Sequence, residues 1–333
     1  MSWFLTGGGQ AHLFSKLCSA EHLFATWEKF ARGKRGKPDV QRFERKLEEN
    51  IFELQSDLLR RKYKHGLYQP FIVHDPKRRQ IHKAPVRDRL LHQAIVDCIE
   101  PYFEKHFIFD SFSCRKNKGT HAGVKRLQKF LRRASANNTK TVYALKCDIR
   151  QFFATVDHEI LLNLIKAKIK DEELLKIVEK IINSFCISPV RGIPLGNVTS
   201  QLFANVYLHE LDWFMKHRLR ESFYLRYCDD FVIVGEDRQK LLELVKPIKQ
   251  FLASELSLNI HSDKTTIKSW NQGIDFLGYV LKPDCILLRS KTRQRMLKRV
   301  NKTNLYSYLG LCSHANSYRL QRLLELKLWE PDH

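Results

Sequence analysis

The stretch 223–235 constrains the fold more than any other part of this sequence. Two apolar, strand-like runs, 223–226 and 231–234, flank the tetrapeptide Tyr-Cys-Asp-Asp. Such runs around a short polar segment predict a β-hairpin. Asp229 and Asp230 would then be adjacent carboxylates at its tip, and their mutual repulsion favours a bound cation. The alternative is an ordinary solvated turn, because Asp is common in turns.

A third acidic residue, Asp148, ends a predicted strand over residues 141–149. A lone Asp at this place is usually a helix cap or a turn residue. If the two strand regions are neighbours in one antiparallel sheet, however, Asp148 converges with the tip at 229–230. Three carboxylates at a sheet surface can bind two hard divalent cations with open positions left over. In-line phosphoryl transfer needs such a site, since one ion activates a 3′-hydroxyl and the other stabilises the leaving pyrophosphate.

The charge of the chain indicates the kind of partner. A formal net charge of +22 predicts binding to a polyanion, most simply the phosphates of nucleic acid. A protein of the membrane surface could also be basic, but no apolar run is long enough to span a bilayer and no signal peptide is expected. The eight cysteines are scattered without a Cys-x-x-Cys pair, which is typical of free thiols in a reducing cytoplasm.

Hydrophobic periodicity predicts a largely helical chain with two hairpins. The second hairpin joins 71–74 to 80–82 through a basic tip, which suits a triphosphate but could also be a solvent-exposed loop. A glycine-containing loop at 191–201 leads into a helix and has no Walker A pattern. A short strand is expected at 276–280. The expected helices cover residues 11–30, 39–62, 121–133, 159–185, 202–218, 241–253 with a kink at Pro247, and 289–302.

These motifs occur in the order found in reverse transcriptases. Asp148 is followed by Phe-Phe at 152–153, Gly-x-x-x-Ser at 196–200, the tip at 227–230, Lys264, and Phe-Leu-Gly at 276–278. From about residue 40 to its end, the chain resembles a reverse transcriptase. The resemblance implies an α+β right-hand polymerase, with an N-terminal segment and helical and hairpin fingers over 1–140. It places an antiparallel-sheet palm over 141–284, with an interleaved fingers segment at about 160–200, and a short helical thumb over 285–333.

The resemblance also implies a catalytic set. Asp148 and Asp229 match the principal metal ligands, Asp230 matches the supporting third, and Ile149 is added to the metal-binding positions. The implied cofactor is Mg²⁺, as two ions, for which Mn²⁺ can substitute. Lys264 matches the lysine that donates a proton to pyrophosphate.

Further matches concern the substrate. Phe153 takes the position of the steric gate, whose ring would clash with a ribose 2′-hydroxyl and so favour deoxynucleotides. Lys77 and Arg79 match the triphosphate-binding residues of the fingers hairpin. Tyr227 would line the floor beneath the primer end. Leu195 and Gly196 belong to the loop that contacts the incoming nucleotide.

Leu195 indicates which group of reverse transcriptases the chain resembles most. Many reverse transcriptases carry Gln before this glycine, whereas an aliphatic residue there, with Ser-Gln at 200–201, is similar to reverse transcriptases of diversity-generating retroelements. That family copies a template-repeat RNA into cDNA that is mutagenised at adenines, and its obligate partner is a basic, oligomeric accessory variability determinant protein. Since Leu cannot hydrogen-bond, we expect relaxed base selection. The other implied partners are template RNA, an RNA/DNA duplex and deoxynucleoside triphosphates, in the cytoplasm of a bacterial, archaeal or phage-encoded system.

Three alternatives stay open at this point. The first is a retron, group II intron-like or phage-defence reverse transcriptase. The second is a non-catalytic RNA-binding protein of the same shape, which would be expected to lack one of the three carboxylates. An RNA-dependent RNA polymerase shares the palm carboxylates, but Phe153 argues against ribonucleotide use.

Overall fold

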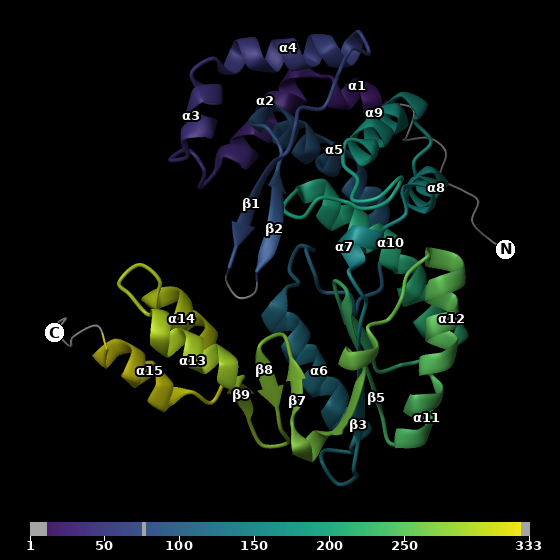
Figure 1. Ribbon diagram of the computed structural model, residues 1–333, viewed down its shortest axis with the longest axis vertical. Coiled ribbons are helices and arrows are strands. Elements are labelled where there is room, and N and C mark those ends of the chain that lie inside the picture. The colour runs from purple at the N-terminus through teal and green to yellow at the C-terminus, as the bar shows by residue number, and fades with distance from the viewer. Residues whose placement is uncertain (1–11, 75–77, 328–333) are drawn as a thin grey trace. The chain divides into compact units, whose positions relative to one another are not determined.

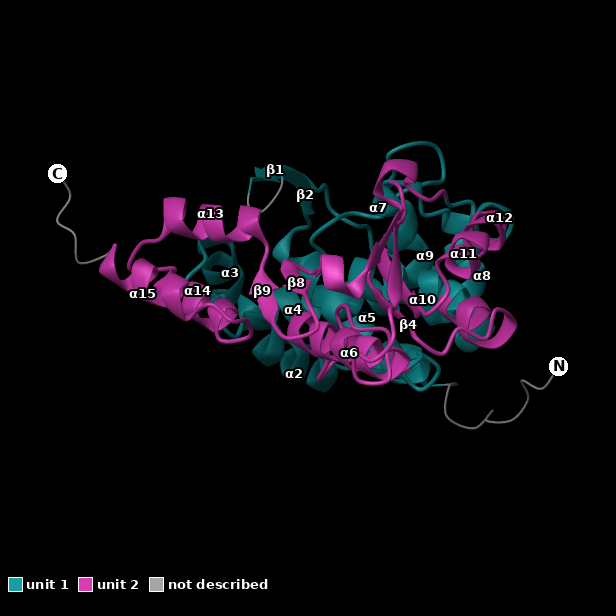
Figure 2. Ribbon diagram, turned by 90° about the horizontal axis from the view of Figure 1, so that it is seen from below, with its two compact units in different colours: residues 1–108, 151–211, 253–258 teal, residues 109–150, 212–252, 259–333 magenta. Residues whose placement is uncertain are grey.

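A computed structural model describes residues 12–74 and 78–327 (Figure 1). The chain divides into two compact units, and it passes between them several times (Figure 2). The first unit comprises residues 1–108, 151–211 and 253–258. The second comprises residues 109–150, 212–252 and 259–333. The division into fingers, palm and thumb at the predicted boundaries stays a prediction.

The first unit is helical apart from one hairpin. Its core lies between α2, α4 and α5, with α1 packed on α5 and α9, and it contains fully buried side chains such as Trp27 and Ile51. Its helices are α1 (Leu13–Leu17), α2 (Ala20–Ala31), α3 (Pro38–Glu44), α4 (Leu47–Leu59), α5 (Val86–Glu104), α7 (Phe152–Thr155), α8 (His158–Lys168), α9 (Glu172–Asn183) and most of α10 (Val198–Trp213).

The hairpin of the first unit joins β1 (Gln69–Val73) to β2 (Arg79–Lys83). The strands are antiparallel, with Phe71 opposite Ile81. The predicted hairpin is therefore confirmed. Lys77, at its tip, lies outside the described residues.

The second unit is built on a four-stranded antiparallel sheet in the order β4-β5-β3-β6. Along β3 the side chains alternate, so that Leu145 and Cys147 face one side and Lys146 and Asp148 the other. Helix α6 contacts β4 and β5, and α11 contacts β3 and β5. The elements are α6 (Thr120–Ala134), β3 (Tyr143–Asp148), a π-helix (Phe214–Arg218), β4 (Tyr224–Tyr227), β5 (Asp230–Gly235), α11 (Arg238–Glu243), α12 (Val245–Leu256) and β6 (Thr266–Ser269).

A smaller sheet and three helices complete the second unit. The strand predicted at 276–280 is wrong: Leu277 and Gly278 have φ angles of 50° and 91°, so they form a tight turn between two short strands. Phe276 and Tyr279 on either side of that turn are buried in the same core as Met296. The elements are β7 (Ile274–Phe276), β8 (Tyr279–Leu281), β9 (Ile286–Leu288), α13 (Ser290–Arg299), α14 (Leu305–Cys312) and α15 (Tyr318–Leu326).

Several predicted helices are interrupted. The helix predicted at 241–253 is divided between α11 and α12, with the break after Glu243. Pro247 explains it, because a proline ring clashes with the carbonyl of the residue four positions earlier. The helix predicted at 159–185 is two helices, since Asp171 caps a new one by accepting the Leu174 N–H. The predicted helices at 11–30 and 39–62 are also each divided in two.

The α+β class is confirmed, because the chain combines many helices with sheets whose strand pairs are all antiparallel within the described residues. Within the described residues, no helix has both the length and the apolar character that crossing a bilayer requires.

Candidate active site

Two acidic side chains meet on neighbouring strands of the four-stranded sheet. β3 and β5 are antiparallel, and their register places Asp148 directly opposite Asp230. Residues in such a pair project from the same face, with Cβ atoms about 5 Å apart. The predicted proximity of Asp148 to the hairpin tip is therefore confirmed, whereas the catalytic role of these residues stays a prediction.

Asp229 lies in the two-residue turn between β4 and β5. Tyr227 and Asp230 close this turn as a strand pair, and Cys228 within it has a φ of 56°. That left-handed conformation is unfavourable for a residue with a side chain, so the surrounding structure must hold it. The Ile149 N–H donates to the Asp229 carbonyl oxygen at 3.2 Å. Ile149 thus contributes through its backbone, which ties the end of β3 to the acidic turn.

A buried ion pair holds this turn from beneath. The Nε and Nη2 atoms of Arg226 donate to the two carboxylate oxygens of Asp212 at 2.7 and 2.6 Å, and neither side chain has exposed surface. The Arg226 Nη1 donates to the Cys228 carbonyl oxygen at 3.1 Å. Because a bidentate pair fixes the plane of the guanidinium, the third contact fixes the left-handed residue of the turn.

No prediction from the sequence included this pair. Its only signal was a single Arg within the apolar run 223–226, since a charge in a buried strand requires a partner. The partner, Asp212, lies at the end of α10, and no periodic pattern connects the two residues. Tyr224 also donates to Asp212, at 2.7 Å, so the carboxylate is fully engaged.

The surroundings of Asp230 disfavour its charged form. Burial raises the pKa of Asp230 to about 6, Lys146 opposes this shift, and the charges of Asp229 and Asp148 add to it. The Lys146 Nζ lies 3.7 Å from Asp230 Oδ1, and the Lys264 Nζ lies 2.9 Å from Asp148 Oδ1. Each of the paired acids therefore has an ammonium group beside it.

A cavity of about 290 Å³ opens beside the paired acids. Its wall is strongly charged and carries more basic than acidic groups, which suits a phosphate-bearing ligand held next to a cation. The lining residues are Ala144, Lys146, Asp148, Asp230, Lys264, Thr266, Lys268, Ile274, Asp275 and Arg289.

The acidic cluster has donors suited to magnesium but is not a closed coordination shell. Carboxylate oxygens are the ligands that hard divalent cations prefer. Burial first, and then the charges of Asp229 and Asp148, raise the pKa of Asp230, so a bound cation would stabilise its charged form. Among the described residues, however, no group of three or more His, Cys, Asp or Glu side chains is arranged so that it could hold a metal ion. The Lys264 ammonium group already contacts Asp148, so a cation would compete with it there.

The loop of Leu195 and Gly196 lies against the hairpin of the first unit. The His82 N–H donates to the Leu195 carbonyl oxygen at 3.1 Å, and the Asn197 Nδ2 donates to the His82 carbonyl oxygen at 3.0 Å. Gly196 has a φ of 105°, and a Cβ there would lie 2.6 Å from the Ile81 Cγ2. Only glycine allows this approach. The loop is therefore an extension of the β2 edge.

The other predicted substrate residues are divided between the units. Phe153 is half-buried in α7 of the first unit, and Arg79 is exposed at the start of β2 in the same unit. Tyr227 belongs to the second unit, where its hydroxyl lies 3.2 Å from the Thr120 hydroxyl. Asp148, Ile149, Asp229, Asp230 and Lys264 all belong to the second unit. The roles predicted for these residues stay predictions.

Comparison with known proteins decides the family. A family model described as reverse transcriptase (RNA-dependent DNA polymerase) matches residues 72–281, which is more than half of the chain. This chain belongs to the reverse transcriptase family. The matched range includes Asp148, both acids of the hairpin tip and Lys264.

Relatives of this reverse transcriptase occur in bacteria. YkfC of Escherichia coli (strain K12) is 26% identical over 274 residues, covering 69% of this chain and 71% of YkfC. The group II intron-encoded protein LtrA of Lactococcus lactis subsp. cremoris is 24% identical over 276 residues, covering 62% of this chain and 44% of LtrA. The chain thus spans under half the length of LtrA.

Among solved structures, apo telomerase from Candida tropicalis is similar in fold. Its TM-score is 0.55 at 11% sequence identity, covering 78% of this chain and 56% of the telomerase chain. At this identity the likeness shows the fold alone.

The buried pair predicts a large stability effect. Arg226→Met should lower the free energy of unfolding by about 3–5 kcal/mol, because it leaves the Asp212 carboxylate buried without a partner. The double variant Arg226→Met/Asp212→Leu should lose much less free energy of unfolding than the two single variants lose in sum. Urea unfolding measures all three. Lys140→Met, which breaks the exposed Lys140–Glu236 pair of the same unit, is the control and should cost under about 1 kcal/mol. If the losses of the two single variants simply add up in the double variant, Arg226 and Asp212 do not stabilise each other as predicted.

The pKa of Asp230 predicts a pH dependence in metal-free buffer. Its folded pKa of about 6 is above the ordinary 3.8, so the folded state favours the protonated form. The stability gained from this proton is present below pH 4 and is lost as the pH rises through 6. Asp230→Asn should therefore be more stable than wild type by about 1–3 kcal/mol at pH 8, with little difference at pH 4.

Urea unfolding in EDTA at several pH values measures this difference. Asp263→Asn, an exposed change of the same kind in the same unit, is the control. Parallel pH curves for wild type and Asp230→Asn would show that Asp230 does not carry the predicted proton.

Proposed function

We propose that this chain is an RNA-directed DNA polymerase that extends a DNA primer along an RNA template. One observation carries the proposal: in a chain of the reverse transcriptase family, Asp148 lies opposite Asp230, next to the turn that bears Asp229. The net charge of +22 supports binding to the phosphates of a template and its duplex.

Asp148, Asp229 and Asp230 would hold the two divalent cations. When bound, magnesium ions supply the positive charge that activates the primer 3′-hydroxyl and stabilises the leaving pyrophosphate. Carboxylate oxygens on two adjacent strands suit this task, because the sheet fixes their spacing.

The remaining roles belong to groups that act on the nucleotide. Lys264 has its ammonium group 2.9 Å from Asp148 Oδ1 and would donate a proton to pyrophosphate. Arg79 and Lys77 would bind the triphosphate, for which a guanidinium fork and an ammonium point charge are both suited. Phe153 would exclude the ribose 2′-hydroxyl, and Tyr227 would lie beneath the primer end.

Within this activity, we infer that the enzyme serves a diversity-generating retroelement. The inference is supported by Leu195, an aliphatic residue at a position where many reverse transcriptases carry Gln. The enzyme would copy a template-repeat RNA into cDNA mutagenised at adenines, together with a basic, oligomeric accessory variability determinant protein. The Leu195 carbonyl oxygen accepts the His82 N–H of β2, which fixes the backbone at this position. The leucine side chain itself has no polar group that could hydrogen-bond a nucleotide.

A second candidate is a group II intron-like reverse transcriptase. The similarity to the group II intron-encoded protein LtrA favours it. The two candidates differ in fidelity: adenine-specific errors on an RNA template would support the retroelement, and uniform accuracy at all four template bases would support the intron-like enzyme. A retron or phage-defence role would be indicated by self-priming or by synthesis without a template.

The catalytic proposal is tested by primer extension on a defined RNA template with Mg²⁺ and four deoxynucleotides. Asp229→Asn should reduce the rate at least about 100-fold, because the variant loses a metal-binding charge on which the transition state depends. Asp237→Asn is the control, since Asp237 is an exposed helix cap of the same unit and Asn caps helices equally well. Full activity of Asp229→Asn would overturn the proposal.

Base selection is tested by misincorporation opposite each template base. Leu195→Gln should lower misincorporation opposite adenine by about fivefold, because one added hydrogen bond contributes roughly 1 kcal/mol to the matched pair. Leu195→Met, which adds length without a hydrogen-bonding amide, should leave the error frequency unchanged. An equal error frequency in wild type and Leu195→Gln would refute the role of Leu195.

A further inference from the structure

Two segments of the first unit, 153–158 and 187–193, are joined by a series of hydrogen bonds that no catalytic role explains. The Ile193 N–H donates to the Phe153 carbonyl oxygen at 2.8 Å, and the Gly192 N–H donates to the Val156 carbonyl oxygen at 2.8 Å. We call these paired segments the gate clasp, because Phe153 is the proposed steric gate. The inference below rests on the proposed function.

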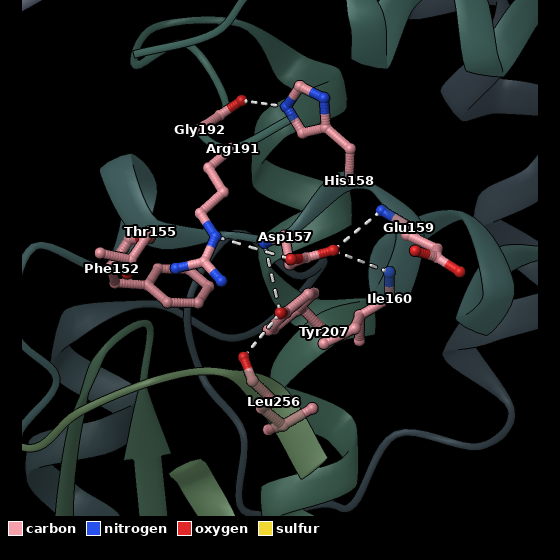
Figure 3. Close-up of polar contacts among 10 residues, drawn as sticks. All are labelled: Phe152, Thr155, Asp157, His158, Glu159, Ile160, Arg191, Gly192, Tyr207 and Leu256. Carbon is pink, nitrogen blue, oxygen red and sulfur yellow. Dashed lines mark hydrogen bonds and ion pairs between the residues drawn. The ribbon is translucent and has the colours of Figure 1, made fainter. Parts of the chain in front are cut away.

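His158 closes the gate clasp with both its backbone and its side chain. Its Nε2 donates to the Gly192 carbonyl oxygen at 2.7 Å (Figure 3). Its backbone N–H donates to the Val190 carbonyl oxygen at 3.0 Å. Since a carbonyl oxygen can only accept, the Nε2 atom carries the hydrogen. The side chain is only 6% exposed, so water cannot replace this bond without rearrangement.

The loop that His158 holds would not keep its shape alone. Val190 and Gly192 have φ angles of 54° and 103°, and a left-handed valine is costly. Two of the bonds from His158 end on these two residues. His158 therefore holds both left-handed residues of the loop, alongside the bond from the Gly192 N–H to the Val156 carbonyl oxygen.

Asp157 anchors the other side of the gate clasp. Its Oδ1 accepts the Glu159 and Ile160 N–H groups at the start of α8, and its Oδ2 lies 3.6 Å from the Arg191 Nε. The Asp157 N–H donates to the Tyr207 hydroxyl at 3.3 Å, as Figure 3 shows. Tyr207 in turn donates to the Leu256 carbonyl oxygen at 2.7 Å. The clasp is thus fixed to two helices and to a later segment of the chain.

The gate clasp continues directly into the loop of Leu195 and Gly196, which is proposed to contact the incoming nucleotide. Ile193, which is bonded to Phe153, is separated from Leu195 by one proline, and the Leu195 carbonyl oxygen accepts the His82 N–H of β2. Because the proline ring fixes the φ angle of Pro194, this residue has little backbone freedom. A displacement of Ile193 is therefore transmitted to Leu195. The gate and the loop are therefore parts of one hydrogen-bonded network.

We propose that His158 is a positioning residue that sets sugar selection at Phe153 and base selection at Leu195 together. Loss of its Nε2–H bond would release Gly192 and Ile193, and so loosen both contacts with the incoming nucleotide. A substitution of Phe153 itself would change sugar selection without changing base selection.

The structural alternative is that His158 only stabilises the fold. A ratio of specificity constants separates the two, because the fraction of folded enzyme cancels from it. The experiment therefore measures kcat/KM for a deoxynucleotide and for the matching ribonucleotide on one RNA template, and kcat/KM for a mismatched deoxynucleotide on the same template.

His158→Leu should lower both selectivity ratios by about five- to tenfold, because the buried Gly192 carbonyl loses its donor and the proposed nucleotide contacts at Phe153 and Leu195 are then held less rigidly. His158→Gln, whose amide can donate from about the same position as Nε2, should keep both ratios within about twofold of wild type. Tyr63→Phe is the matched control. It removes one buried hydrogen bond of the first unit, from Tyr63 to Asp88, and should leave both ratios unchanged.

Should His158→Leu fail to fold, Arg191→Met replaces it, because it removes only the charged contact with Asp157. Arg191→Met should lower both selectivity ratios by a smaller factor than that expected for His158→Leu. Unchanged ratios in the folded variant, or a change in only one ratio, would overturn the proposal. If wild type extends no primer at all, the polymerase assignment fails and the inference fails with it. If wild type is active and the ratios do not move, only the inference fails.

Discussion

The buried contact between Arg226 and Asp212 is the interaction on which the candidate active site depends. A charged pair without exposed surface has a large desolvation cost, which only its full set of hydrogen bonds offsets. One of those bonds holds the Cys228 carbonyl oxygen, and Cys228 has the left-handed backbone that turns the chain between β4 and β5. The placement of Asp229 and Asp230 therefore follows from a salt bridge in the core beneath them.

The first unit positions its candidate residues differently. There, backbone hydrogen bonds join Phe153 to Ile193 and Leu195 to His82 on β2. The buried side chain of His158 adds a hydrogen bond to the Gly192 carbonyl oxygen. In the second unit the candidate residues are charged and repel one another, so lysines lie beside them. The contacts that hold Phe153 and Leu195 are thus hydrogen bonds of the backbone, and the residues proposed for the chemistry lie in a strongly charged cluster.

Much of this arrangement could be predicted from the sequence, because it depends on local pattern. The hairpins at 69–83 and 224–235 were visible as apolar runs around polar turns, and the proximity of Asp148 to the second one followed from strand pairing. The turn at Leu277 and Gly278 was missed because a leucine with a positive φ contradicts its ordinary preference. The Arg226–Asp212 pair and the contact of His158 with Gly192 could not be predicted, since each joins residues whose proximity only the tertiary fold creates.

The division of the chain has a consequence for its synthesis. Neither unit is a continuous stretch, and the first needs residues 253–258, where Leu256 and Leu258 are buried. A nascent chain that has emerged only as far as residue 252 would therefore leave the helical half with an open apolar surface. The first unit can complete its core only once residue 258 has emerged, whereas the second still needs the residues after 258, and no single cut of the chain separates one whole unit from the other.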